Sequence, residues 1–138
     1  FALGRLPLAF SARCYTARSH NLPKDDCRFK CLDYPDGRML KTQEDQEFLV
    51  LNGIQTQSSR THQVLEQIPD LQALGVDVLR ISPQYNDTLR IIDIFSNSIN
   101  TNDLESLSNK LLELLPMSAC NGYLIEQAGM DYGSQKLT

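Results

Sequence analysis

Three cysteines near the start of the chain are the residues best suited to chemistry. Cys14, Cys27 and Cys31 are separated by twelve and then by three residues. Five basic residues lie at or between them: Arg13, Arg18, Lys24, Arg28 and Lys30. Positive neighbours favour the thiolate form of cysteine, which is the form that binds metal. The pattern predicts a metal centre, and an iron–sulfur cluster held by four thiolates is anionic and would be stabilised by the same charges.

The positive charge is confined to this part of the chain. Residues 1–41 carry eight Lys or Arg and four Asp or Glu, whereas residues 42–138 carry five and thirteen. The whole chain has a formal net charge of −4, a pI of about 5.1 and no Trp. Because no ladder of aromatic residues alternates with the basic ones, the sequence argues against nucleic-acid binding.

Composition indicates an ordinary globular protein of 138 residues, 41% hydrophobic and 22% charged. No apolar run approaches the roughly 18 residues that would span a bilayer. The opening FALGRLPLAF has neither an initiator Met nor the pattern of an export signal, so we expect a cytoplasmic protein cut from a longer chain. Without export, the four cysteines are expected to be metal ligands or free thiols and not a disulfide framework.

Apolar runs predict strands at residues 6–12, 48–51 and 76–81. Between the first two strands, residues 15–41 are polar and show no period, and loops of this length are usually functional or disordered. Because cysteines lie along the first half of this loop, we expect a metal to hold it in place.

Helices are predicted between and after the strands. Residues 64–74 have helical spacing, with a break near Ile68 where Pro69 opens a second short helix that Gly75 closes. A helix capped by Asn86 or Asp87 is expected to bury Leu89, Ile92 and Phe95. A further helix, starting at Asn102 with Glu105, is expected to bury Leu104, Leu107, Leu111, Leu114 and Leu115.

Strands separated by helices predict an α/β fold with parallel pairing and right-handed crossovers. Three strands are too few for a complete barrel of about 250 residues, so we expect residues 1–130 to be the C-terminal half of a (β/α) TIM-like barrel domain, with a flexible tail at 131–138. In that architecture, chemistry sits on the loops after the strands. Cys14, Asn52 to Thr56 and Ser82 to Tyr85 occupy such positions.

The amino-acid sequences of several segments resemble those of the collagenase-like peptidase family, in particular of family members that lack evident protease residues. The matching segments are SARCYTARSHNLPKDDCRFKC, YPDGR, VLNGIQTQS, LRISPQ and CNGY, and the likeness runs from Leu6 to about Gly129. It implies an incomplete barrel and a four-iron four-sulfur (4Fe-4S) cluster. Three of the cluster ligands would be Cys14, Cys27 and Cys31, with the fourth in the N-terminal half that this chain lacks.

The resemblance also implies a role in anaerobic, oxygen-independent ubiquinone biosynthesis. The family members concerned form a heterodimer with a homologous UbiU-like subunit and work with a UbiT-like lipid carrier, and the pair is implicated in hydroxylating the ring of a ubiquinone precursor. This chain would then be a subunit of the hydroxylating enzyme and not a peptidase. Its catalytic residues are not indicated.

Each motif also has a plainer interpretation. The three cysteines could be free or bound to zinc, and Cys120 reads as a small buried structural cysteine. His20 reads as a solvated loop residue, and His62 has no partner that the sequence identifies. Since no G-x-S-x-G elbow is present, a serine hydrolase is not favoured.

Polar residues at two strand ends leave alternatives open. Arg80, Ser82 and Gln84 either face the barrel mouth or make ordinary surface contacts, and Asn52, Gln55 and Thr56 either line a pocket or make turn hydrogen bonds. Two function classes follow: a redox enzyme subunit whose cluster works, and a structural or assembly protein whose metal only staples the loop.

Overall fold

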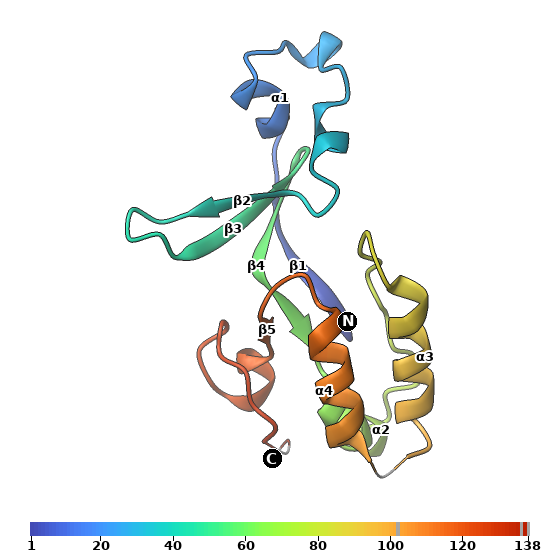
Figure 1. Ribbon diagram of the computed structural model, residues 1–138. Coiled ribbons are helices and arrows are strands. Elements are labelled where there is room, and N and C mark those ends of the chain that lie inside the picture. The colour runs from blue at the N-terminus through green and yellow to red at the C-terminus, as the bar shows by residue number, and fades with distance from the viewer. Residues whose placement is uncertain (102, 136, 138) are drawn as a thin grey trace. The chain divides into compact units, whose positions relative to one another are not determined.

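The computed structural model describes residues 1–101, 103–135 and 137 as a mixed α/β structure. The chain divides into two compact units. The larger contains Phe1–Gly4 and Arg60–Thr138, and the smaller contains Arg5–Ser59. Figure 1 shows helices α2, α3 and α4 in the larger unit and the short helix α1 with the hairpin of β2 and β3 in the smaller one.

The strands form one open sheet with the order β1-β4-β3-β2, and β5 pairs with β4. Their bounds are β1 Leu3–Phe10, β2 Arg38–Lys41, β3 Glu47–Asn52, β4 Gln55–Gln63 and β5 Ala119–Cys120. The expected strand at 48–51 is therefore confirmed as β3. Strands β2 and β4 were not expected, since neither contains an apolar run.

Antiparallel hairpins build the sheet of the smaller unit. Arg38 of β2 lies opposite Leu51 of β3, and Asn52 of β3 lies opposite Gln55 of β4. The connections between these strands are only residues 42–46 and 53–54, whereas a parallel crossover needs about a dozen residues or more. The expectation of parallel pairing is therefore wrong for β3.

Parallel pairing is found in the larger unit. Leu3 of β1 and Ile81 form a parallel bridge, and the Ser82 N–H donates to the Leu3 carbonyl at 2.8 Å. Residues 76–80 do not form the regular strand that the sequence predicts, and Val78 is 80% exposed. Strand β5 also pairs in parallel with β4.

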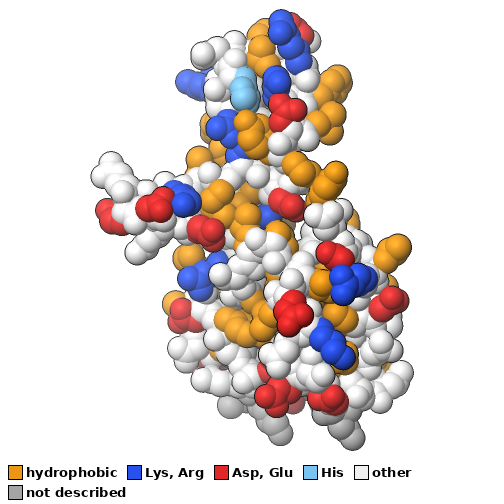
Figure 2. Space-filling view, viewed as in Figure 1, with side chains coloured by type: hydrophobic (Ala, Val, Ile, Leu, Met, Phe, Trp, Pro, Cys, Tyr) orange, Lys and Arg blue, Asp and Glu red, His pale blue; other side chains and the backbone are white. Residues whose placement is uncertain are grey.

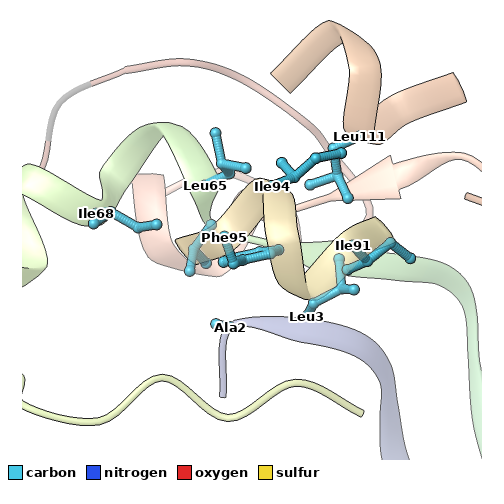
Figure 3. Close-up of a cluster of buried hydrophobic side chains, with 9 residues drawn as sticks. Ala2, Leu3, Leu65, Ile68, Ile91, Ile94, Phe95 and Leu111 are labelled. Carbon is cyan, nitrogen blue, oxygen red and sulfur yellow. The ribbon is translucent and has the colours of Figure 1, made fainter. Parts of the chain in front are cut away.

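The apolar core of the larger unit combines the start of β1 with helices from the rest of that unit (Figure 3). Its buried members are Ala2, Leu3, Val64, Leu65, Ile68, Ile91, Ile94, Phe95 and Leu111. Helix α2, Ile68–Ala73, follows a 3₁₀ turn at Leu65–Gln67, has Pro69 in its first turn and is followed by Gly75 at φ +85°. The second helix therefore has Pro69 in its first turn and ends before Gly75 as predicted, whereas residues 65–67 form a 3₁₀ turn in place of the expected first helix.

Helix α3, Thr88–Ser98, presents a different face to the core from the one expected. Phe95 is buried as predicted, but Leu89 is 77% and Ile92 is 41% exposed. Ile91 and Ile94 are buried in their place. The sequence carries two apolar stripes at helical spacing, and only one of them can face the core.

Helix α4, Leu104–Leu114, packs against α3 and the core. The expected start at Asn102 lies outside the described residues, and the Asp103 carboxylate accepts a hydrogen bond from the Ser106 N–H at 3.3 Å. Leu111 is fully buried. The other leucines of the predicted stripe, Leu104, Leu107, Leu114 and Leu115, are partly buried against the core.

Polar side chains hold residues 132–133 to the larger unit. The Tyr132 hydroxyl lies 3.1 Å from Glu66 Oε1 and 3.1 Å from Ser108 Oγ, and burial raises the pKa of Tyr132. The Asn121 side chain accepts a hydrogen bond from the Gly133 N–H at 2.9 Å and donates to the Gly133 carbonyl at 2.7 Å. Part of the segment expected to be a tail therefore has specific partners in the larger unit.

Two alanine substitutions on α3 test which of its faces is buried. We expect Ile91→Ala to lower the free energy of unfolding by about 2–5 kcal/mol, because it leaves a cavity in the core. Leu89→Ala should change it by less than about 0.5 kcal/mol, because that side chain is exposed. Urea denaturation of both variants measures the difference, and a larger loss for Leu89→Ala would contradict the observed packing.

Candidate functional site

Cys14 lies at the start of a short helix in the smaller unit. Helix α1 spans Tyr15–Ser19, and Cys14 is its N-terminal capping residue. The Cys14 sulfur accepts a hydrogen bond from the Ala17 N–H at 3.4 Å, which replaces one of the bonds that the first turn of a helix lacks. The side chain is partly buried.

Cys27 directly follows the 3₁₀ turn Lys24–Asp26, and Cys31 lies on the next 3₁₀ turn, Lys30–Asp33. Arg28 and Phe29 connect these turns with φ angles of 51° and 49°. Left-handed backbone is rare for residues other than glycine and costs free energy. Both thiols are partly buried.

The structure brings the three thiols into one unit but not into one ligand set. Helix α1 packs against the turn that carries Cys31. Yet among the described residues no group of three or more His, Cys, Asp or Glu side chains is arranged to hold a metal ion. The three cysteines therefore do not form a ligand set for a single metal ion in the part of the chain that the structure describes.

Cys120 is separate from these thiols in position and chemistry. It belongs to β5 in the larger unit, lies opposite His62 of β4 and is 2% exposed. Burial raises the pKa of the Cys120 thiol, which keeps it protonated and unreactive at neutral pH. The predicted burial of Cys120 is confirmed.

His20 has a partner that sequence reasoning missed. Its Nε2 lies 3.1 Å from the Tyr34 hydroxyl, and the Arg38 guanidinium lies over the Tyr34 ring at 4.9 Å from the ring centroid. Arg38 also donates a hydrogen bond to Ser19 Oγ. These contacts connect the end of α1 to residues 34–38. The only sequence signal for them was the presence of an aromatic and a basic residue, Tyr34 and Arg38, in the segment YPDGR.

The polar residues expected near a barrel mouth do not converge. Arg80 lies over the Phe1 ring at 4.8 Å from its centroid, and Gln84 Nε2 donates to the Leu114 carbonyl at 2.8 Å. His62 stacks on the same Phe1 ring, and burial lowers the pKa of His62. These residues serve as packing and hydrogen-bonding groups of the larger unit.

Asn52, Gln55 and Thr56 lie at or beside the β3–β4 turn. Asn52 and Gln55 form the closing pair of the turn, and Thr56 lies opposite Leu51 within the ladder. Gln55 Oε1 accepts a hydrogen bond from the Gln57 side chain at 2.7 Å. The turn positions of Asn52 and Gln55 agree with turn hydrogen bonding.

Comparison with known proteins finds no family model that matches the chain, and no solved structure matches it. No helix in the part of the chain that the structure describes is long and apolar enough to cross a membrane.

Thiol labelling should separate Cys120 from the other cysteines. With an aromatic disulfide reagent at neutral pH, we expect fast reaction of Cys14, Cys27 and Cys31 in the folded chain, and reaction of Cys120 only after denaturation. Absorbance of the released thiol counts the reacting groups. Replacement Cys120→Ala should remove the denaturation-dependent group alone, and fast reaction of all four thiols would contradict the burial of Cys120.

Proposed function

We propose that this chain is part of an iron–sulfur subunit of an oxygen-independent hydroxylation system in ubiquinone biosynthesis, of the UbiV type within the collagenase-like peptidase family. The sequence resemblance supports the assignment, and so does the grouping of Cys14, Cys27 and Cys31 in the smaller unit. The proposed cofactor is a four-iron four-sulfur cluster, and the proposed partners are the homologous UbiU-like subunit, the UbiT-like lipid carrier and a ubiquinone precursor.

One observation carries the metal-binding part of the proposal. Among the described side chains of the smaller unit, the only buried apolar ones are those of Ala17 and Val50. Small units with so few buried apolar side chains are commonly stabilised further by a disulfide, a metal or a partner. Metal binding by three cysteines would supply folding free energy that the apolar side chains do not.

In this proposal Cys14, Cys27 and Cys31 supply three of the four thiolate ligands. The Cys14 sulfur accepts a hydrogen bond from the Ala17 N–H, and thiolates bound to iron accept such bonds as well. A fourth ligand would come from outside this chain. No electron-transfer step is assigned to residues of this chain.

The finer fold proposal is half of a (β/α) barrel. It is supported by the parallel bridge of Leu3 with Ile81, by the parallel pairing of β4 with β5, and by the helices that lie between these segments in the sequence. The remaining strands of such a barrel would have to come from outside these 138 residues.

A structural role is the alternative. The thin core of the smaller unit supports a metal that only staples the cysteine segment as well as it supports a working cluster. The two roles differ in redox behaviour, since solvent exposure, hydrogen bonds and charge set cluster potentials. A structural cluster should stay in one oxidation state at physiological potentials, whereas a working one should cycle.

Iron analysis tests the cofactor. In the full-length protein reconstituted without oxygen, we expect iron and acid-labile sulfide together with a cluster signal in electron paramagnetic resonance. Cys14→Ala, Cys27→Ala and Cys31→Ala should each abolish loading, because each removes one thiolate ligand. Cys120→Ala is the matched control and should leave loading intact; loss of iron in that variant would overturn the ligand assignment.

Quinone analysis tests the function. Cells whose only copy of the protein carries Cys14→Ala should make no ubiquinone without oxygen and normal amounts in air, where oxygen-using hydroxylases act on the same ring. Extraction of quinones from cultures grown both ways measures this. Equal loss in both cultures would favour the structural or assembly role, and no loss in either would refute the proposed function.

A further inference from the structure

We propose that a pocket beside Cys14 binds a small organic anion, a molecule with a carboxylate or phosphate group on an apolar body. The pocket lies wholly within the smaller unit and has a volume of about 590 Å³. That size falls in the range of roughly 300–1,000 Å³ that is typical of small-molecule sites. Its lining combines two arginines, one thiol and four apolar residues.

The two arginines define the charge of the ligand. Arg13 and Arg18 line the pocket, and neither guanidinium has a hydrogen bond or ion pair with any described residue. Arg28, by contrast, lies 3.7 Å from the Asp26 carboxylate. No carboxylate lines the pocket. A guanidinium presents a fork of N–H donors that matches carboxylate and phosphate oxygens, so an oxyanion is the ligand group that these arginines favour.

The remaining walls define the body of the ligand. Ala12, Ala17, Leu22 and Pro23 carry no polar side-chain atoms, and Ala17 is 2% exposed. A hydrocarbon or aromatic group of the ligand that packed against these walls would be removed from contact with water, and this burial of apolar surface is favourable. Figure 2 shows basic and hydrophobic side chains next to one another on the visible surface of this unit.

Local backbone bonds hold the lining in place. The Arg18 N–H donates to the Cys14 carbonyl at 3.0 Å, so Arg18 follows Cys14 by one helical turn. The Leu22 N–H donates to the Ala17 carbonyl at 3.0 Å, which turns the chain back against α1. The Cys14 sulfur, fixed by the Ala17 N–H, lies on the same pocket and can report its occupancy.

Alkylation of the cysteines tests the charge preference. Iodoacetate and iodoacetamide are nearly the same size, and both transfer their carbon to the thiolate sulfur with release of iodide, the thiol proton going to solvent. We define the ratio as the rate with iodoacetate divided by the rate with iodoacetamide. At low ionic strength we expect this ratio to be about threefold or more higher at Cys14 than at Cys27 and Cys31, because the arginines concentrate the anionic reagent. Mass spectrometry of the folded, metal-free chain gives the rate at each cysteine.

Matched variants identify the source of the preference. Combined Arg13→Gln and Arg18→Gln should bring the ratio at Cys14 down to that at Cys27, while Arg28→Gln, an exposed arginine outside the pocket, should leave the Cys14 ratio unchanged. Circular dichroism checks the fold of each variant, and the single variant Arg18→Lys, which retains the charge, should keep most of the preference. Equal ratios at all three cysteines of the unaltered chain would overturn the proposal.

Protection from alkylation distinguishes the two kinds of anion. Benzoate and phenyl phosphate are the probes, and neutral benzamide is the control. In each case Cys14 should be protected and Cys27 should not. Protection by benzoate alone indicates a carboxylate site, and protection by phenyl phosphate alone indicates a phosphate site. Protection by both indicates a general oxyanion site. Equal protection by benzamide, or none by either anion, would refute the proposal. Since no iron is present, this result is independent of the cluster proposal.

Discussion

The pairing of β1 with residues 80–82 is the contact on which the larger unit depends. The Ala2 N–H donates to the Arg80 carbonyl at 2.8 Å, and the bond from Ser82 to Leu3 continues the ladder. This pairing places Ala2 and Leu3 inside the core formed by the helices. It also requires Gly4, whose φ is +133° and where a Cβ atom would lie 2.5 Å from the Ser82 Cβ. One glycine therefore permits the close approach that joins sequence-distant parts of the core.

Helices α2, α3 and α4 and the strands β1 and β3 were predictable because their signals are local. Pro69 and Gly75 bound α2, and four apolar residues in succession form the centre of β3. Strand β4 was not predictable from hydropathy, because its buried positions are Ser59, Thr61 and Gln63. Not all of the polar side chains of β4 are hydrogen-bonded: Thr61 Oγ1 is buried without a partner in the described structure. Such a strand is specified by its neighbours and not by its own composition.

The candidate site was predictable in its residue types but not in its arrangement. Thiols among basic residues are visible in the sequence, and the structure places all three in one unit. Their mutual positions depend on two left-handed residues, Arg28 and Phe29, which no glycine signal announces. The contact of His20 with Tyr34 joins residues fourteen apart, and the arginine pocket depends on the chain returning from Leu22 to Ala17. Sequence spacing alone contains none of these distances.

The two units are stabilised in different ways, and this bears on whether the cysteine segment can change shape. The larger unit has a contiguous apolar cluster, whereas the hairpins of the smaller unit rely mainly on backbone hydrogen bonds. Around the thiols, Phe29 is 71% and Leu32 is 78% exposed, so little packing would be lost if this segment moved. Segments with few buried contacts open at low free-energy cost. The ion pairs of this segment, Arg28 with Asp26 and Lys30 with Asp33, are solvent-exposed and worth about 0–1 kcal/mol each, so they hold it only weakly. Structural zinc in zinc-finger peptides binds with an apparent free energy of about 10–16 kcal/mol, so a metal held by these thiols in a similar way would readily outweigh such costs.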